Sequence, residues 1–348
     1  MEEKVLKMRT NISPLLSHYE LGEFVDLAWA EGGYTNENYI IKTSNGKFFL
    51  KKYLRVSDER VNREHRLLDY LKNQRFPVPR VIKNTAGLTL TEMDGNFYTF
   101  FEFIGGHTRV QTNSVTEEEL RNIAKTLADY HFLAKNMPLS LEPIIPIFNK
   151  NSLNILYNEV VTILRNRREL DEFDQEINKI LAQKIKELNG LEDMDEASLP
   201  SLLTHGDFHA ANFKFNENGE ITAVFDWELS KHQPRIWEVL LAMMFCTKLE
   251  WTWNFHTPID FEKAKLFLQT YNASNPFSKT EIEAIPYLMK VASADLTWPL
   301  KEHYIHNNFG SDRFLPKKTE HWFFWNNENI KKLQGIINGI AYSQPKLI

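Results

Sequence analysis

Two short polar motifs, joined by a predicted β-hairpin, constrain this chain of 348 residues more than any other feature. The first motif, His205–Asn212, reads HGDFHAAN, and the second, at 225–228, reads FDWE. Between the motifs, apolar residues either alternate with polar ones or form a continuous run, and this pattern predicts strands over 212–215 and 221–225. The two motifs therefore belong to one local structure.

Asn218-Gly219 lies between the two predicted strands and favours a two-residue type I′ turn. With that turn, Asn212 lies opposite Phe225, and Asn212 and Asp226 are neighbours at the open end of the hairpin. Their oxygens would lie roughly one strand spacing, about 5 Å, apart. Two oxygen ligands at that separation suit an octahedral Mg²⁺ that takes waters and phosphate oxygens as its other ligands.

Phosphoryl transfer uses the groups that these motifs supply. It needs an aspartate that orients the attacking hydroxyl, and an asparagine and a second aspartate that hold magnesium. Asp207 precedes Asn212 by five residues, the spacing found in the protein-kinase catalytic loop. We therefore expect Asp207 to be the catalytic base and Asn212 and Asp226 to be the metal ligands.

The pattern H-G-D-x-H-x-x-N followed by D-W-E resembles that of the aminoglycoside phosphotransferase and choline kinase superfamily, which includes a type II homoserine kinase. The resemblance implies an α+β, protein-kinase-like fold of two lobes, with ATP and Mg²⁺ as cofactors. The smaller lobe, 1–104, would hold an antiparallel β-sheet and one helix. The larger lobe, 105–348, would be mainly helical and carry the catalytic loop, the metal-binding hairpin and the acceptor pocket.

A predicted strand at 48–53 carries the lysine that the resemblance implies for the α- and β-phosphates. The family pattern places a basic residue directly after a leucine, which selects Lys51, with Lys52 left as the rival on the opposite face. The next segment, 62–71, has apolar residues at helical spacing and carries Glu64. Glu64 occupies the position of the family's lysine-pairing glutamate.

A glycine turn over 31–39 resembles the family's nucleotide-covering loop, whose backbone amides meet phosphates. It departs from the protein-kinase G-x-G-x-x-G pattern, so side chains are expected to share that role. The phosphate-binding residues implied here are Gly32, Gly33, Thr35 and Asn36. An apolar strand over 97–104 then runs into two glycines, where the hinge between lobes should fall. A kinase hinge binds adenine through backbone groups, which assigns Glu102 and Ile104.

Composition excludes several other classes of protein. The chain has 41 basic and 46 acidic residues, a net charge of −5, which argues against a nucleic-acid footprint. Cys246 is the one cysteine, which excludes an internal disulfide and fits a reducing cytoplasm. The apolar run before it, 239–245, is far short of a membrane span, so no membrane partner is expected. The sequence does not indicate an oligomeric state.

The predicted acceptor is a small hydroxylated metabolite: an amino alcohol, homoserine, a sugar or an aminoglycoside. The first alternative is a non-catalytic kinase-like protein with a binding or structural role. A second, a protein serine/threonine kinase, is disfavoured because no A-P-E segment follows Asp226.

Three neighbouring observations have simpler interpretations. A zinc site at His205, Asp207 and His209 is not favoured, because no second cluster of strong ligands is evident in the sequence. Both histidines are expected to have structural hydrogen-bonding roles. Trp237-Glu238 stands where the family usually has an aromatic residue and Asp, so the side chain there is one methylene longer.

Overall fold

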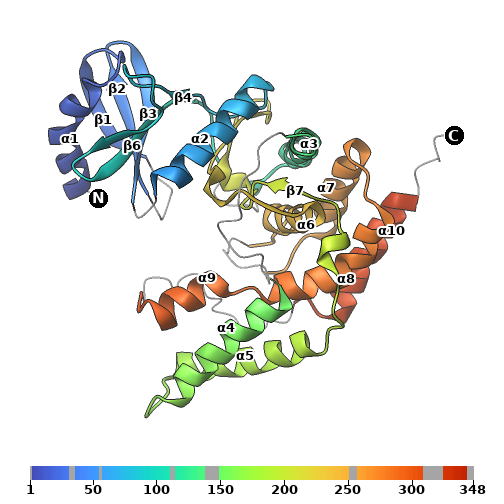
Figure 1. Ribbon diagram of the computed structural model, residues 1–348. Coiled ribbons are helices and arrows are strands. Elements are labelled where there is room, and N and C mark those ends of the chain that lie inside the picture. The colour runs from blue at the N-terminus through green and yellow to red at the C-terminus, as the bar shows by residue number, and fades with distance from the viewer. Residues whose placement is uncertain are drawn as a thin grey trace. The chain divides into compact units, whose positions relative to one another are not determined.

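The structure of the protein, a computed structural model, describes residues 2–30, 36–54, 57–109, 114–137, 149–250, 257–308 and 324–342. These residues form two compact units (Figure 1). The first unit contains the described residues up to Thr108 together with Asn212–Ser230, and the second contains the others. The predicted lobe boundary at residue 104 does not include the later segment, and that boundary stays a prediction.

The first unit is built on a six-stranded antiparallel sheet. Its strands run in the order β1-β2-β3-β6-β4, and β5 also pairs with β6. Burial alternates along β2, where Tyr39 and Ile41 are fully buried, as a sheet with one covered face requires. The strands are β1 (Phe24–Trp29), β2 (Glu37–Thr43), β3 (Gly46–Tyr53), β4 (Val81–Ile82), β5 (Thr91–Met93) and β6 (Asn96–Glu102).

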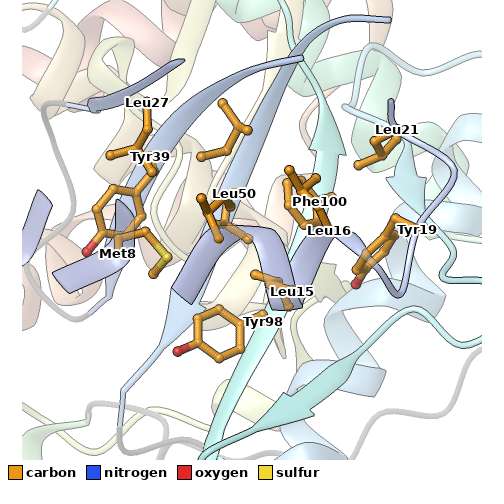
Figure 2. Close-up of a cluster of buried hydrophobic side chains, with 12 residues drawn as sticks. Met8, Leu15, Leu16, Tyr19, Leu21, Leu27, Tyr39, Leu50, Tyr98 and Phe100 are labelled. Carbon is orange, nitrogen blue, oxygen red and sulfur yellow. The ribbon is translucent and has the colours of Figure 1, made fainter. Parts of the chain in front are cut away.

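Helix α1 (Glu2–Leu16) packs its apolar side chains against this sheet. Figure 2 shows Met8 and Leu15 from α1 in one cluster with Leu50 and Tyr98 from the sheet, and all four are buried. Complete burial of a side chain of this size contributes about 1.5–3 kcal/mol. The cluster therefore anchors the strand that carries Lys51.

The prediction of one helix in this lobe is wrong, because the first unit contains two, α1 and α2 (Asp58–Asn73). Helix α2 matches the helix predicted over 62–71, and the Ser57 hydroxyl caps it by accepting from Arg60 N. In α1, polar and charged residues separate the buried apolar ones, and Pro14 lies inside the helix. Helix α1 is stabilised mainly by packing on the sheet that it covers. The local sequence of α1 therefore gives little indication of a helix.

The hairpin predicted between the motifs is present in the first unit, formed by β8 (Phe213–Phe215) and β9 (Ile221–Val224). Phe225 N donates a hydrogen bond of 2.8 Å to Asn212 O. The predicted position of Asn212 opposite Phe225 is thereby confirmed.

The predicted two-residue turn is wrong. Asn216 O accepts from Gly219 N and Asn216 N donates to Glu220 O, both at 3.0 Å, so the loop has three residues. Gly219, at φ +76°, occupies the left-handed position that such a loop needs. A bulge at Thr222, whose hydroxyl donates to Lys214 O at 3.2 Å, adds a residue to β9. The longer loop and the bulge offset each other, so the register at the open end is unchanged.

The second unit is mainly helical, with one short two-stranded antiparallel ladder between β7 (Ser201–Thr204) and β10 (Lys231–Pro234). A capping box between Thr116 and Glu119 starts α3 (Glu117–Ala134). The helices are α3 (Glu117–Ala134), α4 (Lys150–Arg165), α5 (Glu172–Asn189), α6 (Arg235–Cys246), α7 (Phe261–Ser274), α8 (Lys279–Ala294), α9 (Thr297–Leu300) and α10 (Asn327–Tyr342). In the part of the chain that the structure describes, no helix is both long and apolar enough to cross a membrane.

Candidate functional site

Lys51 lies on β3 with its side chain turned into the first unit. Its Nζ is 3.6 Å from Glu64 Oε1 on α2, and both side chains are at most one-tenth exposed. Lys52 points to the other face of the strand, where its Nζ bonds Glu37 at 3.1 Å. The structure thus brings together the Lys51 and Glu64 side chains chosen from sequence. Their role in nucleotide binding stays a prediction.

The Glu228 carboxylate is a second partner of Lys51 that the sequence did not identify. It forms an ion pair with Lys51 Nζ and accepts a hydrogen bond of 2.5 Å from Asn36 Nδ2. Arg60, one turn before Glu64 on α2, donates to Glu228 O at 3.3 Å. The motif D-W-E contains Glu228, but its partners come from distant positions in the chain.

The carboxylates around Lys51 fix its charge state. Burial alone would lower the pKa of Lys51, but the charges on Glu64, Tyr53, Glu228 and Asp226 together outweigh burial and hold that pKa well above its ordinary value. The same crowding acts on Glu64. Burial, together with the charges on Glu228 and Asp226, outweighs the opposing effect of Lys51 and raises the pKa of Glu64 to about 7. Three carboxylates therefore act on the single ammonium group of Lys51.

Asn212 and Asp226 flank the open end of the β8–β9 hairpin. Asn212 ends a short 3₁₀ turn (η3, Ala210–Asn212), and Asp226 precedes another (η4, Trp227–Leu229). Asp226 adopts a left-handed backbone, φ +63° and ψ +62°, which few residues other than glycine tolerate. Strain of this kind often marks functional positions. A carboxylate and an amide, both oxygen donors, fit a hard divalent cation such as Mg²⁺.

The remaining residues predicted for nucleotide binding divide into two groups. Gly32, Gly33 and Thr35 lie outside the described residues, whereas Asn36 lies inside, directly before β2. Of the predicted hinge residues, Glu102 ends β6 and Ile104 lies two residues beyond it. The Glu102 carboxylate accepts from Lys72 Nζ at 2.7 Å. Both sets of assignments stay predictions.

The segment after the predicted hinge is joined to the β8–β9 hairpin within the first unit. His107 and Phe215 exchange two backbone hydrogen bonds, of 3.0 and 2.9 Å. Gly106, at φ +114°, permits this approach, because a Cβ there would meet Phe215 O at 2.4 Å. Gly106, the second glycine of the pair, is therefore needed for the close approach of its backbone to Phe215.

Asp207 lies in the second unit, in the loop after β7. Its backbone N donates to His205 Nδ1 at 3.1 Å, and its Oδ2 is 3.3 Å from His209 Nε2. The two histidines are buried, while the Asp207 side chain is 30% exposed. His205 therefore braces the loop backbone, as predicted, and Asp207 keeps contact with solvent.

The Glu238 carboxylate on α6 binds the backbone of the same loop. One carboxylate oxygen accepts from Gly206 N at 2.6 Å, and the other accepts from His205 N at 3.2 Å and contacts His131 Nε2 at 2.8 Å. Glu238 is 2% exposed. The longer side chain at this position, noted in the sequence, thus retains a direct bond to the loop.

Two buried lysines of the second unit also interact electrostatically with Asp207. Burial lowers the pKa of Lys231 and that of Lys248, the latter to well below its ordinary value, and the Asp207 charge opposes both shifts. Neither lysine was identified from sequence, because no local pattern distinguishes a buried lysine from a solvated one. Over the residues that the structure covers, no group of three or more His, Cys, Asp or Glu side chains could hold a metal ion.

Known proteins with similar sequences are named as kinases. The chain is 24% identical to a homoserine kinase of Bartonella tribocorum, with 90% of this chain and 92% of that protein covered. It is 23% identical to a homoserine kinase of Methylobacillus flagellatus, with 80% of each covered.

Solved structures of similar shape include a spectinomycin phosphotransferase bound to ADP and spectinomycin, with a TM-score of 0.62, 14% identity, and 96% and 97% of the two chains covered. Another is a choline kinase from Cryptosporidium parvum, with a TM-score of 0.58, 16% identity, and 96% and 97% covered. These likenesses confirm the predicted α+β, kinase-like fold class.

The sequence profile of one family spans the segments that carry both motifs. It matches residues 27–265, which is more than half of the chain and includes Lys51, Asp207 and Asp226. The resemblance first drawn from two motifs therefore extends across both compact units. The chain belongs to the phosphotransferase enzyme family.

Proposed function

We propose that this enzyme transfers the γ-phosphoryl group of Mg-ATP to a hydroxyl of a small metabolite, with L-homoserine as the first acceptor to test. The observation that carries the proposal is the buried ion pair between Lys51 and Glu64, in the unit that also supplies Asn212 and Asp226. A lysine fixed in this way by a glutamate is a requirement for phosphate binding in kinases.

The nucleotide is proposed to bind to groups of the first unit. Lys51 contacts the α- and β-phosphates, and the backbone of Glu102 and Ile104 receives adenine. The residues predicted from sequence to contact the phosphates, Gly32, Gly33, Thr35 and Asn36, complete this set. These groups position the nucleotide and neutralise charge, which is most of what catalysis of phosphoryl transfer requires.

Asn212 and Asp226 would hold Mg²⁺. Once bound, the ion supplies positive charge to the β- and γ-phosphate oxygens. The left-handed backbone of Asp226 and its place two residues after β9 support this assignment.

Asp207 orients the acceptor. Its carboxylate accepts a hydrogen bond from the acceptor hydroxyl, and that oxygen forms a bond to the γ-phosphorus as the bond to the bridging oxygen of ADP breaks. The hydroxyl proton passes to Asp207. His205 and Glu238 hold the loop backbone, so Asp207 keeps its orientation during the transfer.

The choice of acceptor rests on the relatives. The sequence relatives named above are homoserine kinases, which supports an amino acid or amino alcohol with a free hydroxyl. The spectinomycin and choline enzymes support the wider class of small hydroxylated acceptors.

The test is ADP release from ATP by the purified chain with L-homoserine, choline, ethanolamine, a hexose or spectinomycin. Each acceptor is assayed with Mg²⁺ and with EDTA. One acceptor should raise ADP release above the acceptor-free rate only with Mg²⁺, and ³¹P NMR should show a new phosphate monoester.

Thermal unfolding with Mg-ADP separates the alternatives. A chain that Mg-ADP stabilises, but that phosphorylates no acceptor, would instead be a nucleotide-binding protein without this activity. A chain that neither binds Mg-ADP nor releases ADP would contradict the proposal entirely.

A further inference from the structure

Glu228 joins three segments of the first unit. Its carboxylate binds Lys51 on β3 and Asn36 directly before β2, and its backbone carbonyl accepts from Arg60 on α2. Arg63, one turn further along α2, donates to Ser230 O at 2.9 Å. The segment that follows Asp226 is therefore fixed to α2, which also carries Glu64.

Asn36 is held at both ends of its amide. Its Nδ2 donates to Glu228, and its Oδ1 accepts from Leu54 N at 3.1 Å. Asn36 is 7% exposed, and the Glu228 side chain is 9% exposed. Hydrogen bonds to a charged, desolvated group are among the stronger ones in proteins. Glu228 thus fixes the residue that ends the predicted phosphate-covering segment.

The same carboxylate competes for Lys51. In the structure the Lys51 ammonium faces Glu64 and Glu228, and the Asp226 charge also acts on it. An ammonium group is a compact charge with three donors. An arriving phosphate must share that charge with Glu228 and also meets repulsion from the carboxylate itself.

We propose that Glu228 is a positioning residue with two separable bonds. This proposal rests on the nucleotide-binding role of Lys51 proposed above. The bond to Asn36 persists and keeps the Asn36 amide in place. The ion pair with Lys51 is exchanged for nucleotide phosphates on binding, so the Glu228 charge sets how tightly the empty enzyme takes up nucleotide.

Glu228→Gln tests the charge alone, because glutamine keeps an oxygen that can accept from Asn36. The Kd of ADP and of a non-hydrolysable ATP analogue is measured by calorimetry, with Mg²⁺ and separately with EDTA. We expect a Kd about tenfold lower than that of the wild type under both conditions. Glu217→Gln removes the same charge from an exposed position of the first unit and should leave the Kd unchanged.

The bond to Asn36 is tested by a double-mutant cycle. Asn36→Ala should raise the nucleotide Kd in the wild type, and should have no further effect in a Glu228→Ala background. Additive effects would mean that Asn36 acts on the nucleotide without Glu228. Thermal unfolding of each variant confirms that it is folded before binding is compared.

The outcomes distinguish this proposal from the function on which it rests. If the wild type binds Mg-nucleotide and Glu228→Gln binds it equally well, the role of Glu228 is wrong and the proposed function stands. Weaker binding by Glu228→Gln in Mg²⁺ alone would make Glu228 a metal ligand, which also overturns the proposal. A wild type that binds no nucleotide would overturn both.

Discussion

Asp207, the proposed proton acceptor, has a partly exposed side chain on a hydrogen-bonded backbone. Its side chain is partly exposed and contacts His209, whereas its backbone N is bonded to the buried His205. Asp207→Asn keeps the size of the side chain and removes its basicity. We expect turnover to fall by about 10²- to 10⁴-fold, with the Kd of Mg-ADP unchanged, because the nucleotide-binding groups lie elsewhere. Steady-state rates and calorimetry measure the two quantities.

A matched control is Asp193→Asn, which makes the same replacement at a carboxylate that is 90% exposed in the second unit. Its turnover should equal that of the wild type. Near-normal turnover in Asp207→Asn, with the acceptor that the wild type uses, would exclude Asp207 as the base.

The buried His65 side chain on α2 should make the protein less stable as the pH falls. It is 3% exposed, and its ring nitrogens contact Thr89 Oγ1 at 2.9 Å and Tyr53 Oη at 3.2 Å. Burial, with a smaller effect of the Lys51 charge, lowers the pKa of His65 to about 3. The folded state therefore keeps the ring neutral down to that pH, while the unfolded chain takes up a proton below about pH 6.5.

The sign follows from that difference. The unfolded state binds more protons between about pH 6.5 and pH 3, so the free energy of unfolding falls as the pH falls through that range. Between pH 7 and pH 5, His65 should account for about 2 kcal/mol of lost stability. Urea denaturation at both pH values should show a loss smaller by that amount in His65→Asn. Equal losses in the two proteins would show that His65 titrates normally.

The three-residue loop of the β8–β9 hairpin distinguishes the observed turn from the predicted one. A type I′ turn needs positive φ at both central residues, Asn218 and Gly219, but in the structure only Gly219 has it. Gly219→Ala should therefore lower the free energy of unfolding by about 1–2 kcal/mol. Asn218→Ala should have a much smaller effect. Chemical denaturation compares the two, and equal losses would favour the type I′ turn.

The hairpin also shows what local sequence can specify. Apolar alternation and the polar motif ends correctly predicted its strands and the partner of Asn212, since Asn212 and Phe225 are close in the chain, only 13 residues apart. The turn was mispredicted because a bulge at Thr222 compensates for one extra loop residue, and no residue preference signals a bulge of this kind. Helix α1 was missed for a related reason, since it is stabilised mainly by the sheet beneath it.

The site residues also divide into those that local sequence identifies and those whose contacts depend on the fold. Lys51, Glu64 and Asp207 stand in motifs whose spacing a resemblance can match. Glu228 and Glu238 bind partners 192 and 32 residues away, at Asn36 and Gly206. Contacts at such separation are decided by the fold, so a single sequence identifies the residues without showing what they bind.

At the scale of the whole molecule, the division into two units does not follow the order of the chain. The segment Asn212–Ser230 belongs to the first unit, more than 100 residues after Thr108. Within that unit, Val224 N donates to Pro77 O at 2.7 Å, and the Trp227 ring meets Phe76 edge to face, with centroids 6.1 Å apart. The β8–β9 hairpin should therefore unfold together with the N-terminal sheet rather than with the helices on either side of it in sequence.

Hydrogen exchange under rising denaturant tests this expectation. Amides of β8 and β9 should open with the same free energy as those of β3 and β6, because one cooperative unit opens as a whole. Phe76→Ala, which removes the partner of Trp227, should lower that free energy by about 3–5 kcal/mol in all four strands and leave α7 protected. Leu268→Ala, at a fully buried position of α7, should do the reverse. If β8 and β9 followed α7 in both variants, the hairpin would belong to the helical unit, and its grouping with the N-terminal sheet would be wrong.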